Sequence, residues 1–432
     1  MILLILAGGV GKRMWPIKKD KLLLDFFGQP YFSHVLNQIK RATKFEKVIV
    51  IASSVNKQAL GKICHQLKLN TEVVEQKNPA GMADAILSAQ HLIKGEVMIV
   101  NGDDTLEPSV YLSVYNLSQK SSTQVIVAAL KVDRYFPGGY LKLKGDKVLG
   151  VVEKPGEGRQ PSDVVKLVVD YFKNGELLIS YLRGAKSQKD DHYEVALARM
   201  IQKGIDIRVS LYQGKFSPLK YPWHVLDLTD HFLNGLKRKI SPKAQIAKSA
   251  LLDGPVVVSE GVRIFEGAVI RGPSFIGKNT IVGNNALIRQ SIIGPSCVVG
   301  FGTEITRSYI GEDCWFHSNY LGDSVIEGDL GMGAGAILAN LRLDGQTIKY
   351  GSDRVETKRD KLGLVAGEGV RIGVQASVMP GVRIGARSLV GPGVVVDKDL
   401  KENTKVVLKQ SFTESKTDAL AAYQRFKGKL VR

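Results

Sequence analysis

Three glycines and two basic residues follow an apolar run near the first residue of the chain. Residues 1–5 are apolar, and the chain continues as Leu6-Ala7-Gly8-Gly9-Val10-Gly11-Lys12-Arg13. Glycines let backbone N–H groups approach an anion without obstruction by Cβ, and the basic side chains add the positive charge that a triphosphate requires. This stretch therefore predicts a strand that leads into a phosphate-binding loop, rather than a plain glycine-rich turn.

The spacing of this loop differs from two common phosphate-binding motifs. A Walker A loop needs Ser or Thr after its lysine, whereas Lys12 is followed by Arg13. A dinucleotide fingerprint needs a third small residue where Met14 stands, and the next predicted strand, residues 47–52, lacks the ribose-binding acid at its end. The loop is therefore expected to bind a nucleoside triphosphate in another way.

Composition indicates a globular protein of about two domains. The chain has 432 residues and a net charge of +18, with 60 Lys plus Arg against 42 Asp plus Glu. The charges are dispersed and aromatic residues make up only 7%, so we expect a solvated basic surface and no nucleic-acid partner. No apolar run approaches the ~20 residues of a membrane span, and no signal peptide is visible. Three widely spaced cysteines argue against disulfides and zinc, so we expect a cytoplasmic protein without a membrane partner; they are Cys64, Cys297 and Cys314.

The first half alternates short β-rich runs with helical patterns up to about residue 212. Runs at 47–52, 72–75, 97–101 and 124–132 are separated by helix-like stretches such as 80–93. This alternation predicts a mostly parallel sheet with helices on both faces. Ligands collect at the carboxyl ends of the strands in such a sheet, where both the glycine loop and Asn101-Gly102-Asp103-Asp104 fall. A helix over 226–236 is expected to link this half to the next.

The second half has a period of six, which is neither helical nor that of a strand. A period of six favours a triangular parallel β-helix, in which each hexad forms one face and points its aliphatic residue inward, over a sandwich of evenly spaced strands. The period breaks between 314 and 369, where polar residues 344–361 predict a loop leaving the coil. Residues 413–431 predict a helix that covers the last coil. The repeated positions are Ile240, Ile246, Leu252, Val258, Ile264, Ile270, Ile276, Val282 and Ile288, then Ile372, Val378, Ile384, Val390 and Val396.

Residues 1–235 resemble the sugar-1-phosphate nucleotidyltransferases in several motifs. The opening loop matches the family pattern through Pro16, and the family's Pro-Lys-x-Leu segment is similar to Asp20-Lys21-Leu22-Leu23. Gln76 and Gly81 stand in a stretch similar to the base-reading segment, and Gly102-Asp103 resembles the metal-binding pair. The resemblance implies nucleotide contacts from Leu6, Ala7, Gly8, Gly9, Gly11, Arg13, Gln76 and Gly81.

The implied reaction is in-line attack of a sugar phosphate oxygen on the α-phosphorus of the triphosphate. Because two polyanions meet, the protein must neutralise charge and align the attack, with no covalent nucleophile. Arg13 would act on the leaving pyrophosphate, Lys21 across the reacting phosphates, and Asp103 would hold Mg²⁺. Gln76 carries a donor and an acceptor on one amide, so it could pair with the imide edge of a pyrimidine.

The sugar side resembles the family less closely. Gly139, Glu153, Lys154 and Glu194 stand in segments similar to its sugar-binding motifs. The family's second metal carboxylate is replaced by Pro218, which leaves Asp227 as the nearest substitute. The family's Ala-Gly-hydrophobic-Tyr strand is replaced by residues 167–170, so no single sugar is indicated.

The hexad region resembles the left-handed β-helix of the bifunctional N-acetylglucosamine-1-phosphate uridyltransferases, and its archaeal branch most closely. The segment from His317 to Ser324 is similar to the motif that holds their catalytic histidine, and Asn340 and Lys361 stand in the stretches that follow. His317 would take a proton as an amino group attacks acetyl-coenzyme A, Tyr320 and Asn340 would position substrate, and Lys361 would bind its phosphate. Asp329-Leu330-Gly331 departs from the family's Asn-x-Asn, which leaves open that His317 is only a polar residue on a coil. The resemblance also implies a homotrimer.

The predicted fold is an α/β Rossmann-like nucleotidyltransferase domain at 1–235, a left-handed parallel β-helix of hexapeptide repeats at 236–410 and a C-terminal helix within 411–432. The leading function is Mg²⁺-dependent formation of a nucleoside-diphosphate sugar and pyrophosphate, with UTP and N-acetylglucosamine 1-phosphate favoured. The β-helix would add acetyl transfer from acetyl-CoA to glucosamine 1-phosphate. One alternative is a glucose-1-phosphate thymidylyl- or uridylyltransferase with a purely structural β-helix. Another is a noncatalytic regulatory subunit of the same fold.

Overall fold

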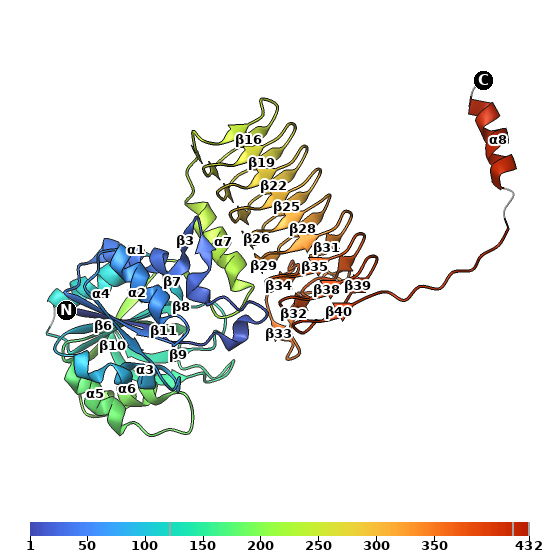
Figure 1. Ribbon diagram of the computed structural model, residues 1–432. Coiled ribbons are helices and arrows are strands. Elements are labelled where there is room, and N and C mark those ends of the chain that lie inside the picture. Colours follow the sequence, from blue (N-terminus) through green and yellow to red (C-terminus); the bar gives the residue numbers. More distant parts are fainter. Residues whose placement is uncertain (121, 417–418, 431–432) are drawn as a thin grey trace.

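The computed structural model describes residues 1–120, 122–416 and 419–430. In Figure 1 a sheet covered by helices lies beside a tall stack of β-coils, and a separate helix stands at the end of an extended segment. The sheet-containing half and the stack of coils correspond to the two predicted domains. Helix α7 (His224–Asn234) lies between them, two residues from the predicted start of the linking helix.

The first domain is built on a nine-stranded sheet of order β5-β4-β1-β6-β11-β8-β12-β10-β9. The pairings β5–β4, β4–β1, β1–β6 and β8–β12 are parallel, whereas β11 and β10 run antiparallel to their neighbours. The other seven strands therefore share one direction, as predicted. The strands are β1 Ile2–Ala7, β4 Lys47–Ala52, β5 Thr71–Glu75, β6 Val97–Asn101, β8 Val125–Lys131, β9 Gly139–Lys144, β10 Lys147–Glu153, β11 Val164–Phe172 and β12 Ile207–Tyr212.

Helices cover both faces of this sheet, and side chains alternate along β1 between the two faces. Leu3 and Ile5 point into one apolar cluster, whereas Ile2 and Leu4 point into the other. The first cluster includes the apolar faces of α1 (Tyr31–Ala42), α2 (Lys57–Gln66), α4 (Pro108–Lys120) and α7. The second includes those of α3 (Met82–Ser88), α5 (Gly175–Gly184) and α6 (His192–Gln202). Short two-stranded pairs complete the domain: β2 Asp25–Phe26 with β3 Gln29–Pro30, and β7 Asp104–Leu106 with β13 Phe216–Pro218.

The second domain is the predicted left-handed parallel β-helix, whose coils contribute strands to three sheets. We call the first the docking sheet: β14 Lys239–Ile240, β17 Val256–Val258, β20 Ser274–Ile276, β23 Ile292–Ile293, β26 Tyr309–Glu312, β29 Val325–Gly328, β34 Val365–Ala366 and β37 Arg383–Ile384. The second is β15 Gln245–Ile246, β18 Arg263–Ile264, β21 Ile281–Val282, β24 Val298–Val299, β27 Trp315–Phe316, β30 Gly331–Met332, β35 Arg371–Ile372, β38 Leu389–Val390 and β40 Lys405–Val406. The third is β16 Leu251–Asp253, β19 Val269–Arg271, β22 Leu287–Arg289, β25 Glu304–Thr306, β28 Tyr320–Gly322, β31 Ile337–Leu338, β36 Ser377–Val378 and β39 Val395–Val396.

From Val258 onward the hexad aliphatics line the inside of the coils, as their period predicts, whereas Ile240 on the first strand is 37% exposed. In the docking sheet Val258 pairs with Ile276 and Ile276 with Ile293, and all three belong to one buried cluster. A strand of two or three residues buries little alone, so the stability of each coil depends on its neighbours. The predicted loop is also present, as a hairpin of β32 (Lys349–Tyr350) and β33 (Val355–Glu356) that interrupts the coils.

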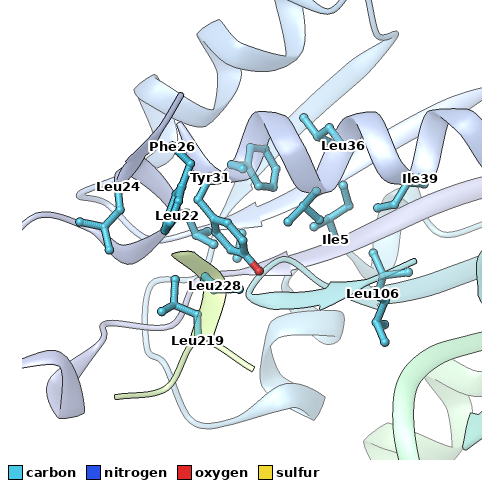
Figure 2. Close-up of a cluster of buried hydrophobic side chains, with 14 of the residues drawn as sticks. Ile5, Leu22, Leu24, Phe26, Tyr31, Leu36, Ile39, Leu106, Leu219 and Leu228 are labelled. Carbon is cyan, nitrogen blue, oxygen red and sulfur yellow. The ribbon is translucent and has the colours of Figure 1, made fainter. Parts of the chain in front are cut away.

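The outer column of the docking sheet is apolar and packs on the first domain. Val257, Phe275, Ile292, Tyr309, Val325 and Val365 follow one another in register along this column. Its aromatic rings meet those of the first domain, with Phe26 and Tyr309 centroids 5.3 Å apart and those of Phe27 and Phe275 5.1 Å apart. These residues belong to the cluster that Figure 2 shows around Phe26, Tyr31 and Leu228. The two domains therefore share one hydrophobic core.

The C-terminal helix α8 (Ala419–Leu430) forms, but the prediction that it covers the last coil is wrong. Figure 1 shows it beyond an extended segment, away from the coils. Tyr423 and Phe426, two of the residues whose spacing suggested a packed face, are 62% and 57% exposed. Helical spacing predicts a helix but does not specify what it packs against. No helix in the described ranges is long and apolar enough to span a membrane.

Replacing Tyr309 by Ala is expected to lower the stability of both domains together. The side chain is 3% exposed at their shared core, and truncating a buried aromatic costs about 3–5 kcal/mol. Phe301→Ala, at a ring that is 64% exposed, is the matched control and should change stability by less than about 0.5 kcal/mol. Thermal unfolding followed by circular dichroism measures both. Equal melting temperatures for the two variants would contradict a shared core.

Candidate functional site

A cavity of about 450 Å³ opens where β1 and β6 end, at the carboxyl edge of the sheet. Its lining contains every nucleotide-side residue expected from the sequence: Leu6, Ala7, Gly8, Gly9, Gly11, Arg13, Lys21, Gln76, Gly81 and Asp103. Asn101 lines it too, at the strand end where ligands were expected, whereas Pro79, Asp190 and Lys220 also line it and were not predicted. Residues separated by more than 200 positions thus meet in one cavity.

Close approach explains why the loop is glycine-rich. Gly102 donates its N–H to the Leu6 carbonyl at 2.9 Å, which joins the end of β1 to the residue after β6. A Cβ on Gly8 would lie 2.6 Å from Oε1 of Gln76, so a larger residue would displace that amide. Gly11 has φ of +61°, in the left-handed region that glycine adopts readily, and leads into the 3-10 turn Lys12–Met14. The turn presents Arg13 beside the ring of Tyr221, 5.5 Å from its centroid.

Lys21 and Asp103 form an ion pair in the cavity wall. The Lys21 ammonium contacts the Asp103 carboxylate and donates to the Leu219 carbonyl at 3.1 Å. Lys21 opens a second 3-10 turn, Lys21–Leu23, which Asp20 caps by accepting the Leu22 N–H at 2.9 Å. The side chains of Lys21 and Asp103 keep 12% and 20% exposure, so both remain accessible to a ligand in the cavity.

The donor set fits a magnesium ion that shares its ligands with substrate. Mg²⁺ is commonly held by one or two carboxylates together with substrate phosphates. Asp103 supplies one such carboxylate in the cavity wall, and the described part of the chain contains no group of three or more potential metal ligands. Asp104, directly after it, is buried, and its Oδ1 has no hydrogen-bond partner. Burial, followed by repulsion from Asp103, raises the pKa of Asp104 to about 6.

Asp227 does not replace the missing second carboxylate. It lies on α7, pairs with Arg359 at 2.5 Å and does not line the cavity. The stretch with Pro218 instead runs as β13 against β7, and Leu219 donates its N–H to the Asp103 carbonyl at 2.9 Å. Lys220 follows and lines the cavity. A lysine side chain therefore stands close to the position where the family pattern has its second carboxylate.

The predicted sugar-side residues gather on β9, β10 and α6, beside the cavity rather than in its wall. Gly139 pairs with Glu153 across the two strands, and a Cβ on Gly139 would lie 3.1 Å from the Glu153 carboxylate. Lys154 contacts Glu153 at 3.0 Å. Burial raises the pKa of Glu194 to about 7. The positive charge of Lys166 lowers this pKa, and the negative charges of Glu153 and Asp170 raise it.

A buried ion pair beneath these residues was not predicted. Lys166 and Asp170 lie 2.5 Å apart on β11, where the strand pairing shifts register, and Tyr193 donates to Asp170 at 2.6 Å. Lys166 also lies 5.0 Å from the centre of the Tyr193 ring. The sequence does contain a signal for this pair, because two opposite charges stand four residues apart in an otherwise apolar strand. Asp170 ends the stretch 167–170 that departs from the family pattern, and Lys166 directly precedes it.

The predicted acetyl-transfer residues fall into two groups. His317 follows β27 and lines a second cavity of about 380 Å³, together with Trp315, Met332, Arg371 and Pro392. The rings of Trp315 and His317 stack with centroids 6.2 Å apart, and both side chains are exposed. None of Tyr320, Asn340 and Lys361 lines this cavity.

Tyr320, Asn340 and Lys361 lie together elsewhere on the β-helix. A Cβ on Gly322 would lie 2.3 Å from the Asn340 amide and 2.8 Å from the Tyr320 hydroxyl, so both side chains border the same space. Lys361 precedes Leu362, whose N–H donates to the Asn340 carbonyl at 2.9 Å. Asp323 accepts from Asn340 at 2.5 Å and from Arg307 at 2.8 and 2.7 Å. Sequence reasoning missed Arg307, which no motif singles out.

Comparison with known families divides the chain in the same way as the fold. Residues 2–209 match the nucleotidyl transferase family. Residues 237–326 match the GMPPB C-terminal domain, and residues 367–398 match the bacterial transferase hexapeptide repeats. The matches cover the sheet domain and most of the coils.

Full-length relatives show both parts in one chain. The "Bifunctional protein GlmU" of Methanococcus maripaludis is 30% identical over 441 residues, covering 96% of this chain and 98% of the relative. That of Methanococcus vannielii is 29% identical over 416 residues, covering 94% and 97%. A protein of Sulfurisphaera tokodaii named "Bifunctional sugar-1-phosphate nucleotidylyltransferase/acetyltransferase" is 29% identical over 404 residues, covering 92% and 97%. The chain therefore belongs to the GlmU-type family of bifunctional sugar-1-phosphate nucleotidyltransferase/acetyltransferase enzymes.

Proposed function

We propose that this enzyme transfers a uridylyl group from UTP to N-acetylglucosamine 1-phosphate and releases pyrophosphate, in a reaction that depends on Mg²⁺. The observation that carries the proposal is the single cavity in which the glycine loop, Arg13, Lys21 and Asp103 meet. Two polyanionic substrates need this combination of backbone donors and cations. The three free, buried cysteines support a cytoplasmic setting.

The residues of the cavity divide the work of an in-line displacement. The loop N–H groups hold the phosphates, Arg13 neutralises charge on the departing pyrophosphate, and Lys21 neutralises charge on the phosphates that react. Mg²⁺, held by Asp103 and substrate phosphate oxygens, would supply further neutralisation at the α-phosphate. The exposure that Lys21 retains allows it to exchange its contact with Asp103 for a phosphate oxygen.

The orientation of Gln76 supports a pyrimidine base. Its Nε2 donates to the Gly81 carbonyl at 3.2 Å and to Asp84 at 2.7 Å. These bonds use the donor side of the amide and leave Oε1 to accept the imide N–H of uracil. Thymine carries the same imide, so a glucose-1-phosphate thymidylyl- or uridylyltransferase with a structural β-helix is the rival. Assays that pair UTP or dTTP with each sugar phosphate distinguish the two by which pair releases pyrophosphate.

We also propose that the β-helix acetylates glucosamine 1-phosphate from acetyl-CoA in a homotrimer. His317 would take the proton of the attacking amine, and Tyr320 and Asn340 would position the sugar, whose phosphate Lys361 would bind. His317 lines a cavity that none of the other three lines, which supports an active site completed by a second copy. Exposed apolar side chains such as Trp315, which is 56% exposed, support this arrangement, since contact with another copy would bury them.

Replacing Asp103 by Asn should reduce pyrophosphate release by about 100-fold or more, because the variant loses the carboxylate proposed to bind Mg²⁺. Asp146→Asn, in a surface pair with Arg208, is the matched control and should keep full activity. A coupled pyrophosphate assay at saturating UTP and sugar phosphate measures both. Unchanged activity in Asp103→Asn would remove the metal assignment, and no release by the native protein with any substrate pair would favour the regulatory-subunit alternative.

Replacing His317 by Ala should abolish thiol release from acetyl-CoA and leave pyrophosphate release intact, since the two cavities are separate. Asn340→Ala should have the same effect. If two copies complete each site, refolding the two inactive variants together should restore part of the thiol release. No recovery in the mixture would place each site within one chain, and no release by the native protein would leave the β-helix a structural role.

Glu194→Gln should change how stability varies with pH. The folded pKa of about 7 lies above the usual 4.5, so between these values the folded state holds a proton that the unfolded chain has released. The contribution of Glu194 to the free energy of unfolding therefore falls as pH rises from about 4.5 to about 7. Relative to native protein, the variant should gain stability over this range, as measured by thermal melts at stepped pH. Glu176→Gln is the control: the pKa of Glu176 is lowered from 4.5, so its contribution changes only below that pH and stays constant over the range tested.

A further inference from the structure

The backbone between Arg13 and Lys21 lies against the β-helix. Residues 15–20 connect the turn that carries Arg13 to the turn that carries Lys21, and they form neither helix nor strand. At one end Asp20 is held within its own domain, because Asn56 donates to both the Asp20 carboxylate and the Ala7 carbonyl at 2.9 Å. The middle of the segment depends on the other domain.

Glu327 of β29 binds this middle part through its carboxylate. Its Oε1 accepts the backbone N–H of Lys18 at 2.9 Å and also that of Lys19. Its Oε2 accepts the N–H of Glu368, on the next coil, at 3.0 Å. The residue is 7% exposed. Charge-assisted hydrogen bonds that a buried carboxylate accepts are stronger than neutral ones, and two bonds to one oxygen orient consecutive peptide groups.

Aromatic contacts fix the start of the same segment. Tyr350 of the hairpin donates its hydroxyl to the Trp15 carbonyl at 3.3 Å. The Arg383 guanidinium lies 4.6 Å from the Trp15 ring centre and 4.9 Å from that of Tyr350. The ring of Tyr350 also meets Trp223, with centroids 4.8 Å apart.

The aromatic contacts continue to the proposed catalytic cation. Trp223 stacks on Tyr221 with centroids 4.4 Å apart, and the guanidinium of Arg13 lies over Tyr221. An uninterrupted series of contacts therefore leads from Tyr350 of the β-helix to Arg13 in the nucleotide cavity.

We infer that Glu327 is a positioning residue for nucleotidyl transfer: from the β-helix it fixes the backbone that aligns Arg13 and Lys21 on the triphosphate. The inference rests on the nucleotidyl transfer proposed above. In-line displacement is sensitive to sub-ångström misalignment of its charged groups, and a segment without regular structure does not hold two cations in place by itself. The β-helix is thus part of the nucleotidyltransferase machinery as well as the carrier of a second site.

A purely structural role for Glu327 makes a different prediction. The domains adhere through the apolar column of the docking sheet, which Glu327 does not join. Removing its charge should therefore free residues 15–20 without separating the domains. A residue that served only to attach the domains would lower stability and leave the turnover of folded protein unchanged.

The test compares Glu327→Gln with Glu312→Gln in the full chain. Glu312 contacts the Lys19 side chain at 3.2 Å, is 55% exposed and does not bind the backbone of the segment, which makes it the matched control. In Glu327→Gln, backbone amide hydrogen exchange of a peptide covering residues 15–20 should quicken by about tenfold or more, with the β1 and β6 peptides unchanged. Turnover at saturating UTP, Mg²⁺ and sugar phosphate should fall by about 10- to 100-fold, with a smaller change in KM.

The outcomes separate this inference from the proposed function. Exchange and turnover equal to those of Glu312→Gln would overturn the positioning role. If the native protein released no pyrophosphate, the proposed function would fail, and the exchange measurement would still decide whether Glu327 holds the segment. Should Glu327→Gln not fold, Glu327→Asp decides by the same two readouts, since it keeps the charge and shortens the side chain that reaches the Lys18 and Lys19 N–H groups. Unchanged exchange and turnover in Glu327→Asp would then overturn the inference.

Discussion

The apolar column along one face of the β-helix is the contact on which the arrangement of the molecule depends. Each coil has only two to four residues per strand, so an isolated face of the β-helix offers little surface to bury. Stacking in register converts single residues such as Phe275, Ile292 and Tyr309 into a continuous apolar strip. The strip meets α7 and the Phe26–Phe27 turn, and the core of the nucleotidyltransferase domain continues across the contact without interruption.

This docking brings polar groups of the β-helix to the segment between two residues of the nucleotide cavity, Arg13 and Lys21. Glu327, Tyr350 and Arg383 stand near the strip and reach the segment between Arg13 and Lys21. Apolar burial supplies most of the attachment, while the hydrogen bonds orient particular peptide groups. Proximity of the domains and alignment of the loop thus have separate physical causes.

The two proposed sites differ in how complete they are within one chain. The nucleotide cavity gathers its residues from one domain, because neighbouring strands of the sheet end at the same edge. The β-helix spreads its polar residues over different faces, because successive hexads turn the chain from one sheet to the next. His317 consequently lines a cavity that does not include Asn340, which borders Tyr320 and Gly322 instead.

The sequence alone determined the succession of strands, helices and hexad coils along the chain and the glycine-loop, Lys21, Gln76 and Asp103 part of the nucleotide cavity. Apolar runs, the six-residue period and the glycine loop are local patterns, and local physical chemistry is enough to interpret them. Only the tertiary structure decided the pairing of Asp227 with Arg359, the buried Lys166–Asp170 pair and the contacts of Glu327. It also placed α8 away from the last coil. Lys166 and Asp170 are only four residues apart, but their burial depends on the helix packed over them. The other features depend on which surfaces meet across large separations in sequence, and a polar residue carries no local signal of its distant partner.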